Sequence, residues 1–562
     1  MKKLRIILCI ILALAMTAAL FACNNDTSTS GNTNNQATTS DAGNSDNAGD
    51  TSTPSGGAAS DGGDEWVSIT VGSTTIGRFL AGLTPIESYL GCDAVYDTVF
   101  RVDPVTKEVF STILTDYYWE DDYTFIMKMR EDVYFNNGAN ATAEDLIFSY
   151  LCHDERGSNY LNQFGLVFDE CKPRDTYTAE MKFKAPFPDF NRGHVFYLIN
   201  KEWSQEKGWD SMEWYTNPVG SGPYYAHEWQ ADSHLILRAR DDYWNKDAGP
   251  IYVDEWVNRA YPDYSTMYMA LEVGEIDICG GIQAADYSRY LRTGSDDFTV
   301  VAVPNGSVLF FCFSRIDTDL WSDKRLREAL AYGVEWDKVG QLARTDLYFP
   351  AYSIASSLSP DYVKTSDLPG VYEYNPEKAK DLLAQAGYGP GNPLKLKTIT
   401  MDNAMLRNAF EAFSFYANQI GVECDIEFGD TNAALSVWLT NEGNDFGFWW
   451  ATAASPAGDV RATINEIADP GGVSWTSVHE EPTLMEIYSR LAYSLDDSVR
   501  SKAAKEIQQY MKDEIVYIPV SEYAAVYGFR TSVFSEEQVA RYFNVARGFA
   551  FPSLLGLESA WK

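Results

Sequence analysis

The five histidines come first among residues that could do chemistry, because imidazoles serve as metal ligands and as general acids and bases. They are scattered along 562 residues, and no two stand four positions apart, the spacing that puts a metal-binding pair on one helix face. Motifs for phosphate loops, zinc proteases, nucleophile elbows and calcium loops are also absent. The sequence therefore predicts a protein that is not an enzyme and holds no metal and no cofactor. The histidines are His153, His194, His227, His234 and His479.

Neighbouring acids are the next candidates, since two carboxylates on either side of a glycosidic bond can hydrolyse it. Asp121 and Asp122 form one such pair, and Asp241 and Asp242 form another. Their spacing does not separate catalytic acids from acids on a solvated surface, and the surface interpretation is simpler. A secreted hydrolase stays open as an alternative.

Charge and cysteine usage exclude several other classes. The formal net charge of −36 argues against a nucleic-acid-binding protein, because such a protein needs clustered Lys and Arg to attract phosphates. Six of the eight cysteines are widely spaced and contain no CxxC pair, so a zinc ribbon or redox motif is excluded. Disulfide pairing among these six is left open.

The N-terminus has the pattern of a bacterial signal peptide. Lys2, Lys3 and Arg5 precede an apolar run that ends at Leu20, which is short for a membrane span. Cys23 then follows a small residue, and this arrangement resembles the lipobox of bacterial lipoproteins. The resemblance implies that Cys23 is lipidated and anchors the chain to the outer face of the cell membrane.

A polar segment separates this cysteine from the globular part. Residues 24–64 are dominated by Ser, Thr, Asn, Gly and Asp, which bury too little surface to fold, so we expect a disordered tether. The roughly 500 residues that follow are more than fold around a single hydrophobic core. They are rich in aromatic residues, so the sequence predicts a globular part with at least two lobes.

Periodicity in this part predicts alternating strands and helices. A strand is expected at 66–73, and 123–130 and 133–135 are expected to form a hairpin-like pair. Thr142 is placed to cap a helix in a capping box with Asp145. A second helix is expected after Asn375, and further strands at 235–239, 300–303, 394–400 and 422–428. This alternation predicts an α/β protein.

One block carries a family resemblance. The stretch from Asn217 to Tyr225 reads NPVGSGPYY, the stretch 237–244 reads LRARDDYW, and the stretch 270–278 reads ALEVGEIDI. Together they resemble the signature of family 5 extracellular solute-binding proteins, the peptide and nickel class of ABC importers. Gly220 and Gly222 permit a tight turn before an edge strand, so we expect this block to be scaffold.

The resemblance implies the fold and the partners. We expect a two-lobed periplasmic-binding-protein-like α/β fold (type II, cluster C), joined by a double crossover, with an extra subdomain inserted in the first lobe. A monomer that passes its solute to ABC permease subunits is expected. The implied segments are a signal peptide at 1–22, the lipidated cysteine and tether at 23–64, lobe I at 65–302 with the inserted subdomain at about 96–214, lobe II at 303–519, and a return segment at 520–562.

The resemblance also implies a ligand site. Peptide-binding members carry Gly-Trp-x-x-Asp-Tyr, whose Asp pairs with the peptide ammonium, but here the Asp position is Ala453. Trp449, Trp450 and Trp475 could stack on a ligand, which keeps an oligosaccharide open beside an oligopeptide. Backbone groups near Thr75 and Ile76 are expected to contact an extended ligand. A nickel-complex binder and a ligand-presenting surface receptor are further alternatives.

Overall fold

The structure is a computed structural model, and it describes most of the globular part. Among the described residues, no helix is both long enough and apolar enough to cross a membrane. The described residues are 66–74, 76, 89–102, 108–156, 168–188, 190–191, 196–314, 320–359, 361–363, 372–430, 434, 437, 443–452, 460–461, 463–464 and 481–545.

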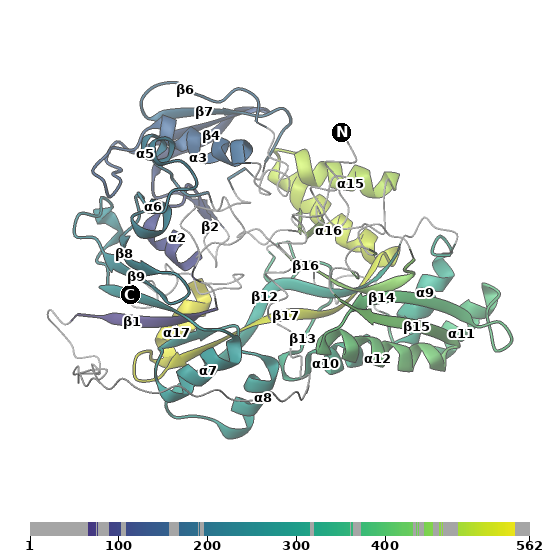
Figure 1. The fold of residues 1–562 in the computed structure, drawn as a ribbon. Helices are drawn as coiled ribbons and strands as arrows, with labels where there is room; N and C mark the ends of the chain where they lie inside the picture. Colours follow the sequence, from purple (N-terminus) through teal and green to yellow (C-terminus); the bar gives the residue numbers. More distant parts are fainter. Residues whose placement is uncertain are drawn as a thin grey trace, which may run out of the picture.

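A mixed sheet runs through the whole molecule (Figure 1). Its order is β16-β12-β17-β11-β1-β10-β9-β8, with β13 paired to β17 off this path. β1 runs parallel to both β10 and β11, and the other pairs are antiparallel. The strands are β1 (Ser68–Ser73), β8 (Tyr224–Gln230), β9 (His234–Ala239), β10 (Glu255–Ala260), β11 (Ile278–Gly280), β12 (Phe298–Phe313), β13 (Phe349–Pro350), β16 (Phe446–Thr452) and β17 (Tyr517–Arg530).

The buried side chains divide into cores on two lobes. In the first lobe one core lies on one face of the sheet and includes Ile69, Val71 and Trp256, and a smaller one packs α7 (Tyr264–Val273) on the other face. The second lobe has its own core, which includes Phe311. The first-lobe helices are α2 (Tyr89–Val95), α5 (Lys201–Lys207), α6 (Glu213–Thr216), α7, α8 (Ala284–Thr293) and α17 (Glu536–Val545).

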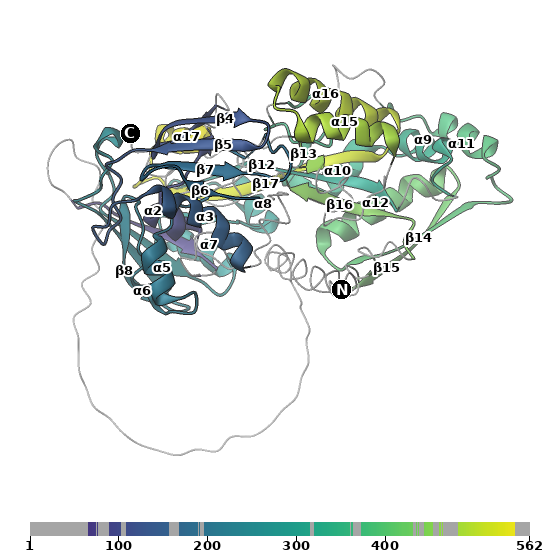
Figure 2. The same cartoon turned by 90° about the horizontal axis from the view of Figure 1, so that it is seen from above.

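β12 and β17 connect the two lobes, as Figures 1 and 2 show from two directions. The final residues of β17, such as Tyr527, belong to first-lobe cores, whereas Val520 belongs to the second-lobe core. In β12, Val300 lies in the first lobe and Leu309 in the second. The implied double crossover therefore corresponds to two long antiparallel strands, and the α/β class is confirmed.

The pairing of these two strands is interrupted between the lobes. Pro304 pairs with Ala524 and Val308 pairs with Glu522, so residues 305–307 of β12 face a single residue of β17. Gly306 has a φ of +91°, a conformation that favours glycine. Such a bulge removes ladder hydrogen bonds and bends a strand, which is suited to a hinge.

A smaller antiparallel sheet lies inside the segment predicted as an inserted subdomain. Its order is β4-β5-β7-β6, with α3 (Ala143–Arg156) packed against it. The bounds of this subdomain remain a prediction. The strands are β4 (Leu114–Asp121), β5 (Thr124–Met129), β6 (Lys172–Pro173) and β7 (Thr178–Lys182), and a separate pair is β2 (Arg101–Val102) and β3 (Val109–Phe110).

The predicted hairpin between 123–130 and 133–135 is wrong. β5 is already paired on both edges, to β4 and β7. Residues 133–141 instead fold back on themselves around Gly138, with a single bridge between Tyr134 and Asn140. The Asn-Asn-Gly turn thus closes a tight loop of its own rather than leading into a longer strand pair.

The predicted cap at Asn375 is confirmed, and at Thr142 the structure shows the half of the capping box that Asp145 provides. The Asp145 carboxylate accepts hydrogen bonds from the backbone N and the hydroxyl of Thr142, both at 2.9 Å, at the start of α3. The Asn375 side chain accepts from the N of Lys378 at the start of α11 (Pro376–Gln385). Cap chemistry acts within a few residues, which is why sequence alone locates these helix starts.

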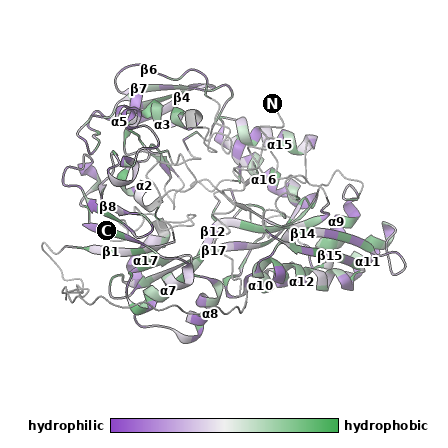
Figure 3. Cartoon of the chain, in the orientation of Figure 1, coloured by the Kyte–Doolittle hydropathy of each residue, from purple (hydrophilic) through white to green (hydrophobic). Residues whose placement is uncertain are grey.

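The second lobe combines helices with a two-stranded parallel sheet. β14 (Leu394–Met401) and β15 (Val422–Gly429) confirm two predicted strands. α12 (Ala404–Gln419) buries Leu406, Phe410 and Phe413, and its ribbon shows both hydrophobic and hydrophilic residues (Figure 3). The other helices of this lobe are α9 (Lys324–Gly333), α10 (Trp336–Arg344), α15 (Pro482–Tyr493) and α16 (Asp497–Asp513). A short 3₁₀ turn, η2 (Thr345–Leu347), follows α10, and another, η1 (Lys246–Ala248), lies between β9 and β10 in the first lobe.

The signature block is scaffold in the described structure. A Cβ on Gly220 would lie 2.0 Å from the carbonyl oxygen of Val95, and one on Gly222 would lie 2.4 Å from that of Ala94. The Arg240 guanidinium donates to the Gly222 carbonyl at 3.1 Å. The glycines therefore let this turn lie directly against the end of α2, as the sequence interpretation expected.

Candidate functional site: the junction between the lobes

Strand direction shows where a site can form in the first lobe. β11 pairs with β17 so that Ile278 faces Phe529 and Gly280 faces Tyr527. β11 therefore runs toward the part of β17 that comes from the second lobe, and β1 runs parallel to it. In open α/β sheets, ligands bind at the carboxyl ends of the strands. These ends point toward the junction between the lobes.

A second-lobe strand runs toward the same place. β16 begins at Phe446, opposite Phe313, and ends at Thr452, opposite Ser307 beside the β12 bulge. Strand ends from both lobes thus meet at the interrupted middle of β12 and β17. We take this junction as the candidate site.

The residues predicted for the site are only partly described. Trp449 lies on β16 opposite Phe310, is 8% exposed and belongs to the second-lobe core. The backbone of Trp450 pairs with Leu309. Ile76 is half-buried against the first-lobe core. Their contacts with a solute remain a prediction. Four predicted residues lie outside the described part of the chain: Cys23, Thr75, Ala453 and Trp475.

A buried carboxylate on β17 binds a second-lobe loop at the junction. Glu522 is 2% exposed and lies on β17 at the interrupted pairing. Its side chain accepts hydrogen bonds from the Ser356 hydroxyl at 2.7 Å and from the backbone N of Ser357 at 3.0 Å. The loop before residue 360 is thereby held to the connecting strand.

A direct contact between lobes lies next to this loop. The Ser288 hydroxyl of α8 donates to the carboxylate of Asp346 in η2. Leu347, also in η2, is 5% exposed and packs in the smaller first-lobe core. η2 follows α10 of the second lobe directly, so the end of α10 lies where the lobes meet.

That end carries a cluster which sequence reasoning missed. The Arg344 guanidinium lies 4.3 Å from the ring centre of Tyr523 on β17 and 3.4 Å from the sulfur of Met405 in the first turn of α12. The Tyr523 hydroxyl lies 3.3 Å from the same sulfur. Burial raises the pKa of Tyr523 to about 12 and lowers the pKa of Arg344. No pattern in the sequence distinguishes Arg344 from a surface arginine.

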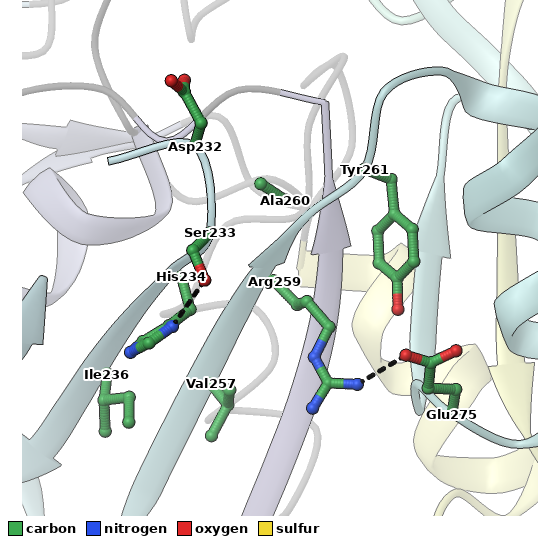
Figure 4. A pocket seen from close by; sticks show the side chains of 9 residues that line it. All are labelled: Asp232, Ser233, His234, Ile236, Val257, Arg259, Ala260, Tyr261 and Glu275. Carbon is green, nitrogen blue, oxygen red and sulfur yellow. Dashed lines mark hydrogen bonds and ion pairs between the residues drawn. The ribbon is translucent and has the colours of Figure 1, made fainter. Parts of the chain in front are cut away.

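A surface pocket of about 450 Å³ lies on the first lobe, over β9 and β10 (Figure 4). Arg259 and Glu275 face each other there in an ion pair of 2.8 Å. A hydrogen bond of 3.0 Å joins the Nδ1 of His234 to the Ser233 hydroxyl, and the Nε2 of His234 lies 3.2 Å from the Glu228 carboxylate. Because these polar groups partner one another, the pocket is a weaker candidate than the junction.

The described residues offer no metal-binding cluster and no activated cysteine as a second candidate site. Within those stretches, no group of three or more His, Cys, Asp or Glu side chains is arranged to hold a metal ion. Four of the described cysteines are buried: Cys92, Cys152, Cys279 and Cys312. Burial raises the pKa of the Cys312 thiol above its usual value, which disfavours the reactive thiolate.

Comparison with known proteins gives a clear family. The model of bacterial extracellular solute-binding proteins, family 5 Middle, matches residues 109–475. An oligopeptide-binding protein, AppA of Bacillus subtilis, is 27% identical over 285 residues, which is 47% of this chain and 49% of that protein. By that match the chain spans about half the length of its relative. A dipeptide-binding protein of Escherichia coli is 24% identical over 381 residues, 60% of this chain and 69% of that protein.

Solved structures with the same fold are also found. The substrate-binding protein CtaP of Listeria monocytogenes aligns with a TM-score of 0.70 at 20% identity, covering 83% of this chain and 95% of that one. A putative peptide-binding protein AppA from Clostridium difficile aligns with a TM-score of 0.71 at 16% identity, covering 88% and 98%. At these identities the likeness shows the fold.

Proposed function

Because the chain belongs to the family 5 bacterial extracellular solute-binding proteins, we propose that it is the receptor of an ABC importer. It captures an oligopeptide or a peptide-like solute between its lobes and delivers it to the permease subunits in the membrane. Lipidation of Cys23 anchors the protein to the outer face of that membrane, and the flexible tether at 23–64 lets the lobes move away from the membrane surface.

The observation that carries this proposal is the connection between the lobes. Two cores meet at β12 and β17, and the pairing of these strands is interrupted between Pro304 and Val308. Few ladder hydrogen bonds resist bending there, while each lobe has its own packed interior. A hinge of this kind lets a solute be enclosed between rigid bodies.

The names of relatives support the solute class. AppA of Bacillus subtilis is an oligopeptide-binding protein, and the Escherichia coli relative is a dipeptide-binding protein. Ala453 departs from the peptide-binding pattern described for the family, so the ammonium of a peptide needs another partner here.

Segment bounds belong to the same proposal. Lobe I spans 65–302, lobe II spans 303–519 and the return segment spans 520–562. The interruption between Pro304 and Val308, and the change of core between Val520 and Tyr527, support junctions near these bounds.

A thermal-shift screen tests the proposal. The chain from Asp64 onward is melted with peptide, oligosaccharide and metal-chelate libraries, because a ligand at 100 times its Kd adds about 2.7 kcal/mol of stability. Peptides are expected to raise the Tm. Mass spectra of the same mixtures should show peptides and glycans intact, whereas cleavage products would identify a hydrolase. Stabilisation by sugars alone would contradict the peptide class, and no stabilisation by any library would contradict the function.

A further inference from the structure

A cation–π contact between Arg461 and Phe187 joins the two lobes away from their connecting strands. The guanidinium carbon of Arg461 lies 4.8 Å from the centre of the Phe187 ring. Phe187 follows β7 of the smaller sheet and belongs to the first-lobe core. Arg461 lies in a helical turn with Val460 and Ile464, which belong to the second-lobe core. The contact therefore spans two bodies that pack around separate cores.

Each partner is fixed by the lobe that carries it. The Phe187 ring is 3% exposed and stacks on Phe183, with the ring centres 6.1 Å apart. Phe183 in turn contacts the ring of Trp119 on β4. On the other side, Val460 and Ile464 are fully buried, so the turn that carries Arg461 is anchored. A cation attracts a ring more strongly when the pair is shielded from water, as this one is.

The position of the contact relative to the hinge gives it a role in opening. Figure 1 shows the smaller sheet above β12 and β17, and α8 and α10 below them. The contact between Ser288 of α8 and Asp346, which follows α10, therefore joins the lobes on the lower side. Bending that moves the smaller sheet away from the second lobe must break the contact between Arg461 and Phe187. The lower contact can persist during the same motion.

We propose that Arg461 and Phe187 form a latch that stabilises the closed arrangement of the lobes. The latch gives the closed form a measurable minority population before any solute binds. This inference rests on the proposed function and adds a device that sets its affinity. When the lobes separate, the ring and the guanidinium return to water and their attraction weakens. For a solute that binds only the closed form, the apparent Kd rises by the factor by which the closed population falls.

Single-molecule fluorescence energy transfer tests the latch in the absence of solute. The full chain is purified with its lipid anchor in detergent, with dyes on Asp122→Cys in the turn after β4 and Lys505→Cys in α16, two exposed positions. The parent without added cysteines, treated with the same dyes, corrects for labelling of native thiols. The wild-type distance should show two populations, an open majority and a closed minority.

Substitutions then separate the cation–π attraction from simple packing. Arg461→Met keeps an apolar stem without the cation, and Phe187→Leu keeps an apolar side chain without the ring. Each should lower the ratio of closed to open molecules about 3- to 10-fold. The double variant should lose no more than either single variant, because the two residues form one interaction. Arg461→Lys keeps a cation over the ring and should retain most of the closed population.

Arg407→Met is the matched control for these variants. The Arg407 guanidinium lies 4.3 Å from the centre of the Phe428 ring, and both residues belong to the second lobe. Its loss removes the same kind of contact within one body, so the ratio of closed to open molecules should not change. Thermal melts establish that each variant is folded, and if Phe187→Leu does not fold, the Arg461 variants decide.

Four results would overturn the latch. They are a single distance in the wild type, an unchanged ratio in Arg461→Met, an equal loss in Arg461→Lys and Arg461→Met, and additive losses in the double variant. None of these measurements requires a solute. They therefore distinguish failure of the latch from failure of the proposed function, which the thermal-shift screen tests separately.

Discussion

At the scale of single residues, Asp97 shows how the signature block is held in place. This carboxylate is fully buried and accepts hydrogen bonds from the Tyr243 hydroxyl at 3.1 Å and the Trp244 indole N–H at 2.9 Å. Burial is the main cause that raises its pKa, and Arg101 at 3.9 Å offsets this in part. The block near residue 240 is thereby tied to the end of α2.

The raised pKa of Asp97 predicts a pH-dependent effect. The folded state holds the proton more tightly than the unfolded state, so this group's stabilisation is full below pH about 4 and is lost as pH rises through the folded pKa. Asp97→Asn keeps one oxygen that can accept a hydrogen bond. Because the amide does not ionise, the variant should not lose this stabilisation as the pH rises. Its Tm relative to wild type should therefore increase from pH 4 to pH 7 in thermal melts. A difference that does not change with pH would contradict this origin. Asp97→Leu should cost about 2 to 4 kcal/mol, because two donors lose their acceptor.

Cys23 allows a second prediction at this scale. Cys23→Ala removes the thiol that we propose accepts the lipid, so the protein should move from the membrane pellet to the soluble fraction. Cys9→Ala changes a cysteine inside the expected signal peptide and should leave the protein in the pellet. Cell fractionation with mass spectrometry of the N-terminus measures both. A wild type without acyl mass, or a Cys23→Ala variant that stays in the membrane, would contradict lipid anchoring.

At the scale of elements, the turn before β8 is sensitive to a single methyl group. A Cβ at Gly220 would fall 2.0 Å from the backbone oxygen of Val95, which also accepts a hydrogen bond from the N of Gly222 at 2.8 Å. Gly220→Ala should therefore lower the free energy of unfolding by about 3 kcal/mol, measured by urea denaturation. Gly389→Ala is the control, because nothing lies within 4 Å of a Cβ there. Equal stability of the two variants would contradict the close approach.

Elements with local signals were predictable from the sequence. Cap residues such as Thr142 and Asn375 act over three or four positions, and both helices begin where expected. Alternation in 394–400 and 422–428 predicted β14 and β15. For β12, only 300–303 was expected. Residues 308–313 are buried in a continuous apolar run, which period-two alternation does not identify.

The candidate site was less predictable, for physical reasons. Arg344 ends one helix, Tyr523 lies in a strand and Met405 begins another helix, so only tertiary folding brings them together. The predicted tryptophans came from family resemblance, and Trp449 turned out to be buried in the second-lobe core. Sequence indicates that a tryptophan packs somewhere, but its exposure depends on which sheet face it occupies.

At the scale of the whole molecule, the account depends on two bodies joined at one hinge. Each lobe has its own core, and β12 and β17 pass between them at an interrupted ladder (Figure 1). Ligand enclosure should bring the lobes together by bending at residues 304–308 and 522–524, without changing either core. The high negative charge favours separate, soluble lobes in the absence of a solute.

Small-angle X-ray scattering of the chain from Asp64 onward tests this claim most directly, using the solute that gives the largest thermal shift. A folded chain of this length has a radius of gyration of about 23 Å. Saturating solute should reduce the measured radius, with a midpoint that matches the binding curve. Binding that leaves the radius unchanged would contradict capture between two closing lobes.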